Sequence, residues 1–341
     1  MRGNINKRYL KRRKNWFERN IAWFIIIIIL LVIASAGTIF CINIFGKTNN
    51  VDTNSSVSDE SKSVQNLETN PVDWIINEEP NIKKVAYTAP ANTQYPYVIK
   101  VNRAMCCVTV YGIDNSGAYS IPVISFACSV GKAGDETIVG ENYNTTDKYP
   151  WRLMVDNSYA QDAFRIDGGY LFHSVPYTIM SNDSLETDQF NLLGSPASLG
   201  CVRLKMSDVK WIYDNCPAGT KVTIYDDATT PGPLGKPDTI KIPLDSPNAG
   251  WDPTDTNVNN PWLKSSAKIE GAKDITTKVN QNVDIKAGVT AKDTCGNDIT
   301  NKLVVVGKYT FDQVGEYSIK YEVTDAIGSK AEVTVNLKVI N

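Results

Sequence analysis

Phe172-His173-Ser174-Val175-Pro176-Tyr177 and Ser198-Leu199-Gly200-Cys201-Val202-Arg203 are the two stretches that decide the fold, and 24 residues lie between the histidine and the second stretch. This histidine is the only one in the 341-residue chain. A cysteine becomes a strong nucleophile when a nearby imidazole takes its proton. Gly200 allows a tight turn that can aim backbone N–H groups at an oxyanion. The pattern predicts a cysteine/histidine acyl-transfer site; the alternative is an inert buried thiol and a hydrogen-bonded core histidine.

The two stretches resemble the catalytic motif of the L,D-transpeptidases (the YkuD-type domain), in which a histidine precedes a Ser/Thr-His-Gly-Cys-aliphatic-Arg/Asn block. The resemblance covers about residues 93–227. It implies a mainly β fold, an L,D-transpeptidase-type β-sandwich with one or two short helices. The other segments that match are 97–102, 108–111, 124–132, 211–214, 217–220 and 222–225.

The resemblance also implies roles for individual residues. Cys201 would be the nucleophile and His173 the general base and acid. The backbone carbonyl of Ser174 would orient His173, and the N–H groups of Gly200 and Cys201 would form the oxyanion hole. The family carries a thioacyl intermediate with a peptidoglycan stem peptide on this cysteine. We therefore expect no cofactor and no metal at the site.

Four further residues are candidates for substrate binding or loop support: Ser198, Arg203, Tyr159 and Tyr170. Ser198 is expected to stabilise the loop by a hydrogen bond. Arg203 occupies the Arg/Asn position of the motif, where it would either brace the loop through an ion pair or contact the substrate directly. The two tyrosines are candidate oxyanion or substrate contacts, and the sequence does not choose between them.

The chain departs from the family pattern in three places. Leu199 stands where many members have a second histidine, so His173 would act alone. The interval before the second stretch is longer than usual, which implies an inserted loop around residues 181–191. The Thr-Pro-x-Gly segment common in the family is here Thr137-Ile138-Val139-Gly140, without its proline. None of these changes removes the nucleophile or the base.

The N-terminal region combines a basic tail with an apolar stretch. Residues 1–20 carry a formal charge of +7 on a chain of net charge −2, so residues 21–341 carry −9. Residues 21–45 are uncharged and longer than the roughly 20 residues that a membrane-spanning helix needs. The positive-inside rule then predicts a cytoplasmic tail (1–20), a transmembrane signal anchor (21–45) and an extracellular catalytic domain. A cleaved signal peptide ending at Ala34-Ser35-Ala36 is the alternative, but apolar residues continue to Phe45.

The rest of the chain divides by composition. We expect an extracellular linker (46–92), the catalytic domain (93–227), a linker rich in Pro, Asp and Asn that spaces domains apart (228–264), and an Ig-like domain (265–341). Alternating apolar residues over 317–323 and 333–339 predict a hairpin of a β-sandwich, and the strings around them resemble the Ig-like repeats of bacterial surface proteins. Within the catalytic domain, Ser207 is expected to cap a helix over 208–213 that ends at Cys216-Pro217.

The chain has seven cysteines, including Cys41 in the predicted span. If Cys201 stays free, five remain outside the span, so they cannot all pair within the chain and a disulfide scaffold is not expected. A single disulfide stays open. Cys106 and Cys107 are neighbours on a predicted strand, so they should face opposite sides of it. No Cys-x-x-Cys spacing and no second histidine support a zinc site.

By resemblance, the expected function is cross-linking of peptidoglycan stem peptides, with release of the terminal D-alanine. The alternatives are an L,D-carboxypeptidase, in which water resolves the thioester, and a catalytically inactive wall-binding surface protein; a sortase-like enzyme fits the Cys201 motif less well. The expected partners are stem peptides, the membrane through one helix, and a wall polymer or protein at the Ig-like domain. We expect no nucleic-acid partner, because the basic segment is short. The analogy suggests a single-pass protein of a Gram-positive cell membrane.

Overall fold

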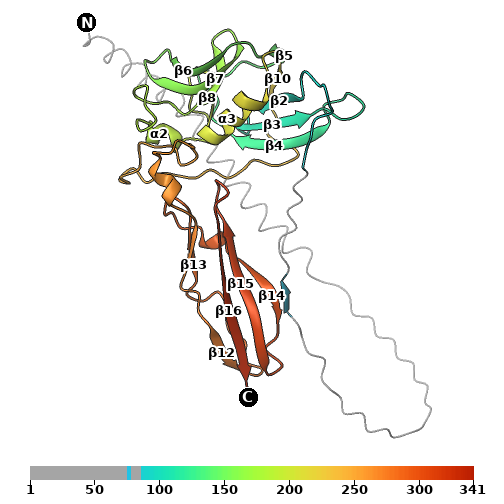
Figure 1. Ribbon diagram of the computed structural model, residues 1–341, viewed down its shortest axis with the longest axis vertical. Coiled ribbons are helices and arrows are strands. Elements are labelled where there is room, and N and C mark those ends of the chain that lie inside the picture. The colour runs from blue at the N-terminus through green and yellow to red at the C-terminus, as the bar shows by residue number, and fades with distance from the viewer. Residues whose placement is uncertain (1–74, 78–85) are drawn as a thin grey trace, which may run out of the picture. The chain divides into compact units, whose positions relative to one another are not determined.

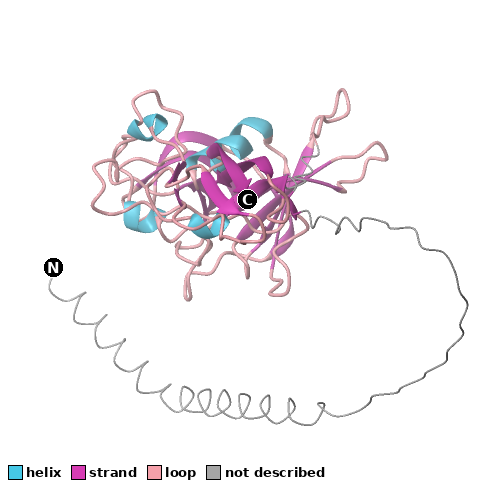
Figure 2. Cartoon of the chain, turned by 90° about the horizontal axis from the view of Figure 1, so that it is seen from below, coloured by secondary structure: helices cyan, strands magenta, loops and turns pink. Residues whose placement is uncertain are grey.

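The computed structural model describes residues 75–77 and 86–341. The predicted cytoplasmic tail (1–20), the predicted transmembrane anchor (21–45) and most of the predicted linker (46–92) lie outside the described residues. Within the described part of the chain, no helix combines the length and the apolar character needed to cross a membrane. Strands dominate and the helices are short, as Figure 2 shows, which confirms the expected mainly β class.

Two sheets make up the region that contains the motif (Figure 1). The first has the strand order β4-β3-β2-β10-β5, in which β10 runs parallel to β2. The second has the order β6-β7-β8-β9, in which β9 runs parallel to β8. The bounds of these strands are β2 (Tyr97–Asn102), β3 (Cys107–Gly112), β4 (Ile121–Ala127), β5 (Gly140–Asn144), β6 (Lys148–Leu153), β7 (Tyr159–Asp167), β8 (Tyr170–Ser174), β9 (Val202–Leu204) and β10 (Lys221–Tyr225).

One hydrophobic core joins the two sheets and helix α3 (Met206–Asn215). Ile99 and Val101 of β2 pack in the same cluster as Phe164 of β7 and Phe172 of β8, and all four are fully buried. Burying a large apolar side chain contributes about 1.5–3 kcal/mol. Phe172 immediately precedes the motif histidine, so its burial in the core holds this part of β8 in place.

The start of α3 differs from the prediction. Ser207 is not the cap: the helix begins at Met206, and its first N–H groups are satisfied by residues far along the chain. The Met206 N–H donates to Asp252 Oδ2 (2.8 Å), and the Ser207 N–H donates to Thr254 Oγ1 (3.0 Å). The predicted stop at Cys216 is confirmed as the C-cap. A downstream segment therefore supplies the acceptors that a local cap would provide.

The segment 228–264 does not act as the extended spacer that its composition suggested. Its apolar residues Ile240, Ile242 and Trp262 are buried in one cluster with Tyr177 and Phe190. It ends in a short 3-10 helix, η1 (Pro261–Lys264). The few large apolar residues within this polar stretch thus pack against the catalytic region. We call residues 228–264 the strap.

The C-terminal region forms two sheets around a second core. Their strand orders are β1-β14-β15-β16-β12 and β11-β13. The predicted hairpin is confirmed: β15 and β16 pair antiparallel around a turn at residues 325–329. The bounds are β1 (Ile75–Asn77), β11 (Lys268–Glu270), β12 (Ile275–Lys278), β13 (Thr290–Lys292), η2 (Thr300–Lys302), β14 (Val304–Tyr309), β15 (Gly315–Thr324) and β16 (Lys330–Ile340).

Two smaller features bear on the sequence predictions. Residues 75–77, which fall in the predicted linker, form β1 and pair antiparallel with β14. The six cysteines in the described part of the chain are all free. Cys106 lies in the core that joins the two sheets, whereas the Cys107 Sγ lies 3.7 Å from the carbonyl oxygen of Gly235 in the strap. The two side chains thus do not share one core, as expected, but Cys106 lies in the turn before β3 with φ +51° and not on the predicted strand.

Candidate active site

His173 is held as a neutral base by its own strand. It lies in β8 and is only 1% exposed, and its Nδ1 is 2.6 Å from the backbone oxygen of Ser174. A carbonyl oxygen can only accept, so Nδ1 carries the hydrogen and Nε2 keeps its lone pair. Burial, reinforced by the positive charge of Arg203, lowers the pKa of His173 from 6.5 to about 3. At neutral pH the imidazole is therefore uncharged and able to take a proton at Nε2.

Cys201 immediately precedes β9, which is the strand paired with β8, where the histidine lies. The register pairs His173 with Arg203, so Cys201 and His173 are offset by two residues along neighbouring strands. Residues two apart point to the same face of a sheet. Burial raises the pKa of the Cys201 thiol, and its Sγ lies 3.6 Å from the carbonyl oxygen of Gly169. The resting site thus pairs a thiol with a neutral imidazole rather than a thiolate with an imidazolium.

The loop before Cys201 is shaped by Ser198 and Gly200. The Ser198 hydroxyl donates to the Cys201 carbonyl (2.6 Å) and accepts from the Gly200 N–H (3.1 Å). Gly200 has φ +117°, and a Cβ there would lie 2.9 Å from Cε1 of Tyr170. Both the backbone and the neighbouring ring therefore require glycine at this position.

This geometry corrects the predicted oxyanion hole in part. The Gly200 N–H is already bonded to Ser198, so it does not face the cavity as a free donor. The Cys201 N–H makes no hydrogen bond within residues 75–77 and 86–341, and it is the donor available to an oxyanion. Ser198 makes hydrogen bonds within this loop, and its role in catalysis stays a prediction.

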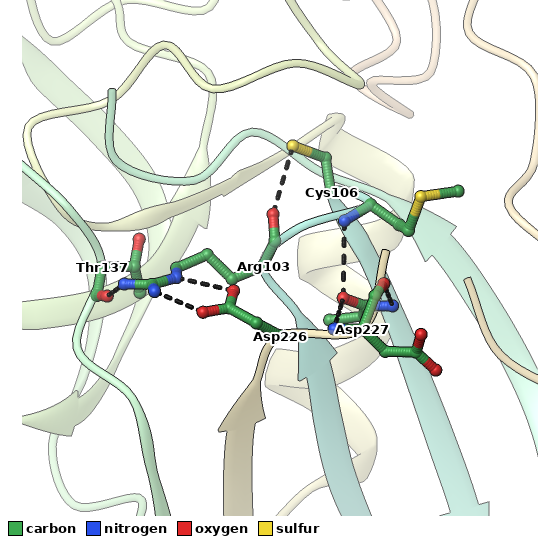
Figure 3. Close-up of polar contacts among 7 residues, drawn as sticks. Arg103, Cys106, Thr137, Asp226 and Asp227 are labelled. Carbon is green, nitrogen blue, oxygen red and sulfur yellow. Dashed lines mark hydrogen bonds and ion pairs between the residues drawn. The ribbon is translucent and has the colours of Figure 1, made fainter. Parts of the chain in front are cut away.

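The loop that contains Ser198 is also held by the neighbouring segment 131–137. The Thr137 hydroxyl accepts from the Gly131 N–H (2.8 Å), and Gly131 forms a parallel bridge with Ser198. Figure 3 shows the guanidinium of Arg103 reaching both the Thr137 carbonyl (2.7 Å) and the carboxylate of Asp226. The segment that lacks the family's proline is thus anchored by the threonine that it retains.

His173 and Cys201 open onto one cavity of about 350 Å³. Its charged wall contains two arginines and one aspartate, and its apolar wall comes mainly from the β6–β7 connection and from Leu199. Leu199 is 44% exposed, so the position that carries a second histidine in many family members here presents an apolar side chain. The lining residues are Arg152, Leu153, Met154, Val155, Asp156, Ser158, Gly169, Tyr170, Leu171, His173, Pro176, Ser198, Leu199, Cys201 and Arg203.

The structure separates the two candidate tyrosines. Tyr170 lines the cavity and packs on Gly200, whereas Tyr159 is not among the lining residues. Tyr159 pairs by backbone hydrogen bonds with Tyr177 (2.8 and 2.7 Å) and packs against the cluster around that residue. Tyr159 therefore does not line the cavity that His173 and Cys201 share, because β7 places it in the packing under the strap.

Arg203 is buried at the cavity wall without the ion pair that one alternative required. It is 6% exposed, and its Nη1 donates to Gln189 Oε1 (2.9 Å) and to the carbonyl of Ala197 (3.4 Å). Within the described residues it has no carboxylate within 4.0 Å, and its Nε has no hydrogen-bond partner. Its contacts are thus with neutral acceptors.

Several residues at this site were not predicted from the sequence: Arg152, Asp156, Gln189 and the apolar run 153–155. A signal was present in part, because Leu153-Met154-Val155 is apolar at a position between two strands where turns are ordinarily polar. Val155 is 90% exposed. Gln189 had no signal, since it belongs to α2 (Thr187–Phe190) in the inserted loop and its importance depends on the contact with Arg203.

Comparisons with known proteins identify two domains in the chain. Residues 96–224 match the L,D-transpeptidase catalytic domain (YkuD), and residues 267–339 match the bacterial surface protein Ig-like domain. A protein of Bacillus subtilis (strain 168) described as a putative L,D-transpeptidase, YciB, is 31% identical over 150 residues, which are 41% of this chain and 74% of that protein.

Solved structures of similar proteins include an L,D-transpeptidase from Mycobacterium smegmatis, 18% identical with a TM-score of 0.31, over 39% of this chain. Another is an L,D-transpeptidase from Stackebrandtia nassauensis, 16% identical with a TM-score of 0.29, over 40% of this chain. The match spans 60% of the length of each of those two structures. On the strength of the sequence matches, the chain belongs to the L,D-transpeptidase (YkuD) family and also carries a bacterial surface Ig-like domain.

Proposed function

We propose that the protein is a peptidoglycan L,D-transpeptidase that works through a thioester on Cys201. The observation that carries this proposal is the hydrogen bond between His173 Nδ1 and the Ser174 carbonyl. This nitrogen is committed to the Ser174 carbonyl at 2.6 Å, so Nε2 is the free lone pair in a cavity that Cys201 shares. A neutral imidazole beside a neutral thiol is suited to taking the proton as the sulfur attacks, rather than before.

In the first half-reaction the Cys201 sulfur attacks the carbonyl of the third residue of a stem peptide while His173 Nε2 takes the thiol proton. The carbonyl oxygen becomes an oxyanion, which the Cys201 N–H stabilises. When the tetrahedral intermediate collapses, the C–N bond to the terminal D-alanine breaks, and His173 returns the proton to the leaving amine. The products are a thioester on Cys201 and free D-alanine.

In the second half-reaction a side-chain amine of another stem attacks the thioester carbonyl. His173 takes a proton from this amine and passes it to the departing sulfur, which restores the thiol and leaves an amide cross-link. If water attacks instead, the same site is an L,D-carboxypeptidase and the product is a stem shortened by one residue.

Intact-mass measurement of the full chain tests this function. After incubation with a tetrapeptide stem, and separately with a carbapenem, an acyl adduct is expected on the wild type and none on Cys201→Ala. His173→Ala should slow acylation by 10²-fold or more, the usual contribution of a general base. A folded wild-type protein that acquires no adduct from either reagent would leave a wall-binding protein instead of an enzyme.

We also propose that residues 21–45 anchor the protein in the cell membrane with residues 1–20 in the cytoplasm and the catalytic and Ig-like domains outside. The proposal rests on the charge asymmetry and on the length of the apolar stretch. The Ig-like domain would then contact a wall polymer or a wall protein. Protease added to intact protoplasts should degrade the catalytic domain, and protection of that domain would overturn the orientation.

A further inference from the structure

The pairing of β7 with β8 has a gap beside the motif histidine. At one end Tyr159 exchanges two backbone hydrogen bonds with Tyr177 (2.8 and 2.7 Å), and at the other end the pairing resumes at Phe164 and Phe172. Both strands advance by the same number of residues between these two pairs, so no residue is inserted. The gap is therefore a local separation of the two strands.

A hydroxyl group carries the hydrogen bond that the gap interrupts. In an antiparallel ladder the hydrogen-bonded pairs recur every second residue, so Gln161 and Val175 should bond directly, two positions on from the tyrosine pair. Instead the Val175 N–H donates to the Leu204 carbonyl of β9 (3.0 Å). The Gln161 N–H donates to the Ser174 hydroxyl (2.8 Å), which donates to the Val175 carbonyl (2.9 Å). Two bonds in series thus replace one bond of about 2.9 Å, and the hydroxyl fills the gap.

Asp162 lies at the gap with an unusual backbone. Its φ is +47°, and among the described residues it is the only non-glycine residue with positive φ that lies inside a strand. On its other side is Pro150 of β6, which has no N–H, and the pairing of β6 with β7 skips these two residues without a change of register. The Asp162 carboxylate makes no hydrogen bond or ion pair within the described chain. The position therefore supplies a backbone conformation, one that Asp and Asn adopt more readily than other non-glycine residues.

The gap controls the carbonyl that binds His173. Ser174 is fully buried, its backbone oxygen lies 2.6 Å from His173 Nδ1, and its hydroxyl is bonded on both sides of the gap. Because the hydroxyl and the carbonyl are both engaged, the Ser174 backbone cannot turn without breaking a hydrogen bond. If β7 closed onto Val175, the direct ladder bond would displace the hydroxyl and remove that constraint. Sparsely populated backbone conformations persist where the surrounding structure fixes them, and they are concentrated at active sites.

We propose that Asp162 is a positioning residue for the general base: its positive φ keeps β7 open, so that the Ser174 hydroxyl spans the gap and fixes the carbonyl that binds His173 Nδ1. The proposal rests on the proposed function, in which Nε2 must keep its lone pair for the thiol proton. Asp162 does not line the cavity, so it acts only through Gln161 and Ser174. The bond at Nδ1 sets the tautomer, because the hydrogen stays on the ring nitrogen that has an acceptor.

Three variants separate the backbone of Asp162 from its carboxylate. Asp162→Gly adopts positive φ freely and should keep the acylation rate within about twofold of wild type. Asp162→Val is strongly disfavoured at positive φ, so it should close the gap, and Ser174→Ala removes the bridging hydroxyl. In the full chain incubated with a tetrapeptide stem, these two variants should lower the acylation rate at saturating peptide by about tenfold to hundredfold, which is within the contribution of a general base. The half-saturating peptide concentration should not change.

A measurement on the imidazole itself does not depend on the reaction. In full-length protein labelled with ¹⁵N-histidine, NMR follows hydrogen exchange at His173 Nδ1. Exchange should be slow in the wild type and in Asp162→Gly, and at least about tenfold faster in Asp162→Val and Ser174→Ala, where part of the hydrogen moves to Nε2. Thr220→Val is the matched control, because it removes a fully buried hydroxyl that donates to the Pro217 carbonyl (2.7 Å) in the turn before β10. It should lower the melting temperature without changing acylation or the tautomer.

A folded Asp162→Val variant with wild-type acylation and wild-type exchange would overturn the proposal. An Asp162→Gly variant as impaired as Asp162→Val would also overturn it, because the carboxylate would then be the group that the site needs. If Asp162→Val does not fold, Ser174→Ala decides: slow exchange at Nδ1 overturns the proposal and faster exchange supports it. If the wild type is not acylated at all, the proposed function fails, and the exchange measurements still decide the positioning role.

Discussion

The chain has one histidine, so the protonation of the proposed base, His173, can be measured by NMR without resonance assignment. Burial and the charge of Arg203 lower the pKa of His173 to about 3, and Nδ1 donates to the Ser174 carbonyl. In full-length protein labelled with ¹⁵N-histidine and carrying no polyhistidine tag, we expect one imidazole with the hydrogen on Nδ1. Its chemical shifts should stay constant from pH 8 to pH 4.5.

The same shift predicts how stability depends on pH. In the unfolded chain the imidazole, with a pKa near 6.5, becomes protonated as pH falls below 6.5, whereas in the folded protein it stays neutral until pH is about 3. The stabilisation is therefore complete above pH 6.5 and is lost as pH falls, by 1.36 kcal/mol for each pH unit. Between pH 6.5 and pH 5 the unfolding free energy should fall by about 2 kcal/mol on account of this residue.

Urea unfolding of the wild type and of His173→Asn, at pH 7.5, 6.5, 5.5 and 5, measures that contribution. The asparagine amide can replace the Nδ1 donor without titrating, so the difference between the two proteins isolates the imidazole. An imidazole signal that titrates between pH 6 and 7, or unfolding free energies that fall in parallel for both proteins, would refute the argument that His173 is a buried neutral base.

Three further outcomes are expected. Gly200→Ala should lower the unfolding free energy by about 1–3 kcal/mol, because φ is +117° and the new Cβ would lie 2.9 Å from the ring of Tyr170; thermal unfolding measures it, and a double variant with Tyr170→Ala should recover only the steric part. Thr137→Val should lower the unfolding free energy by about 1–3 kcal/mol and slow acylation, because it leaves the Gly131 N–H without its acceptor. Thr137→Ser keeps the hydroxyl and should keep wild-type stability and acylation rate, so equal effects of the two variants would contradict this prediction. Burial raises the pKa of Asp252 from 3.8 to about 6, so between these pH values the folded protein binds a proton that the unfolded chain does not. As pH falls from 6 towards 3.8, the unfolding free energy of the wild type should rise by up to about 3 kcal/mol relative to that of Asp252→Asn. A difference in urea unfolding that stays constant with pH would contradict this prediction.

The parts of the fold that could be predicted are those whose signal is local. Alternating apolar residues placed the hairpin of β15 and β16, because one face of each strand must be buried. The adjacent residues His173 and Ser174 contain the candidate base and the carbonyl that binds its Nδ1, and the loop from Ser198 to Cys201 contains its own supporting hydrogen bond. Contacts between residues that are close in sequence, such as these, can be predicted from the sequence.

The predictions that failed depended on contacts distant in sequence. Ser207 has the chemistry of a cap, but Asp252 and Thr254 satisfy the start of α3 from more than 40 residues away. The strap was taken for a spacer because its polar composition hides three buried apolar residues. Tyr159 was indistinguishable from Tyr170 until the register of β7 placed it against Tyr177.

The sequence by itself determined the family, the candidate nucleophile and base, and the β class, because these depend on residue identity and on short periodicities. Only the tertiary structure decided that the insertion reaches Arg203, that the Gly200 N–H already makes a hydrogen bond, and that Arg203 is buried with Gln189 rather than with a carboxylate. The physical reason is that burial and charge compensation are set by neighbours in space. Residues 189 and 203 lie 14 positions apart on different elements, and no local pattern records that their side chains meet.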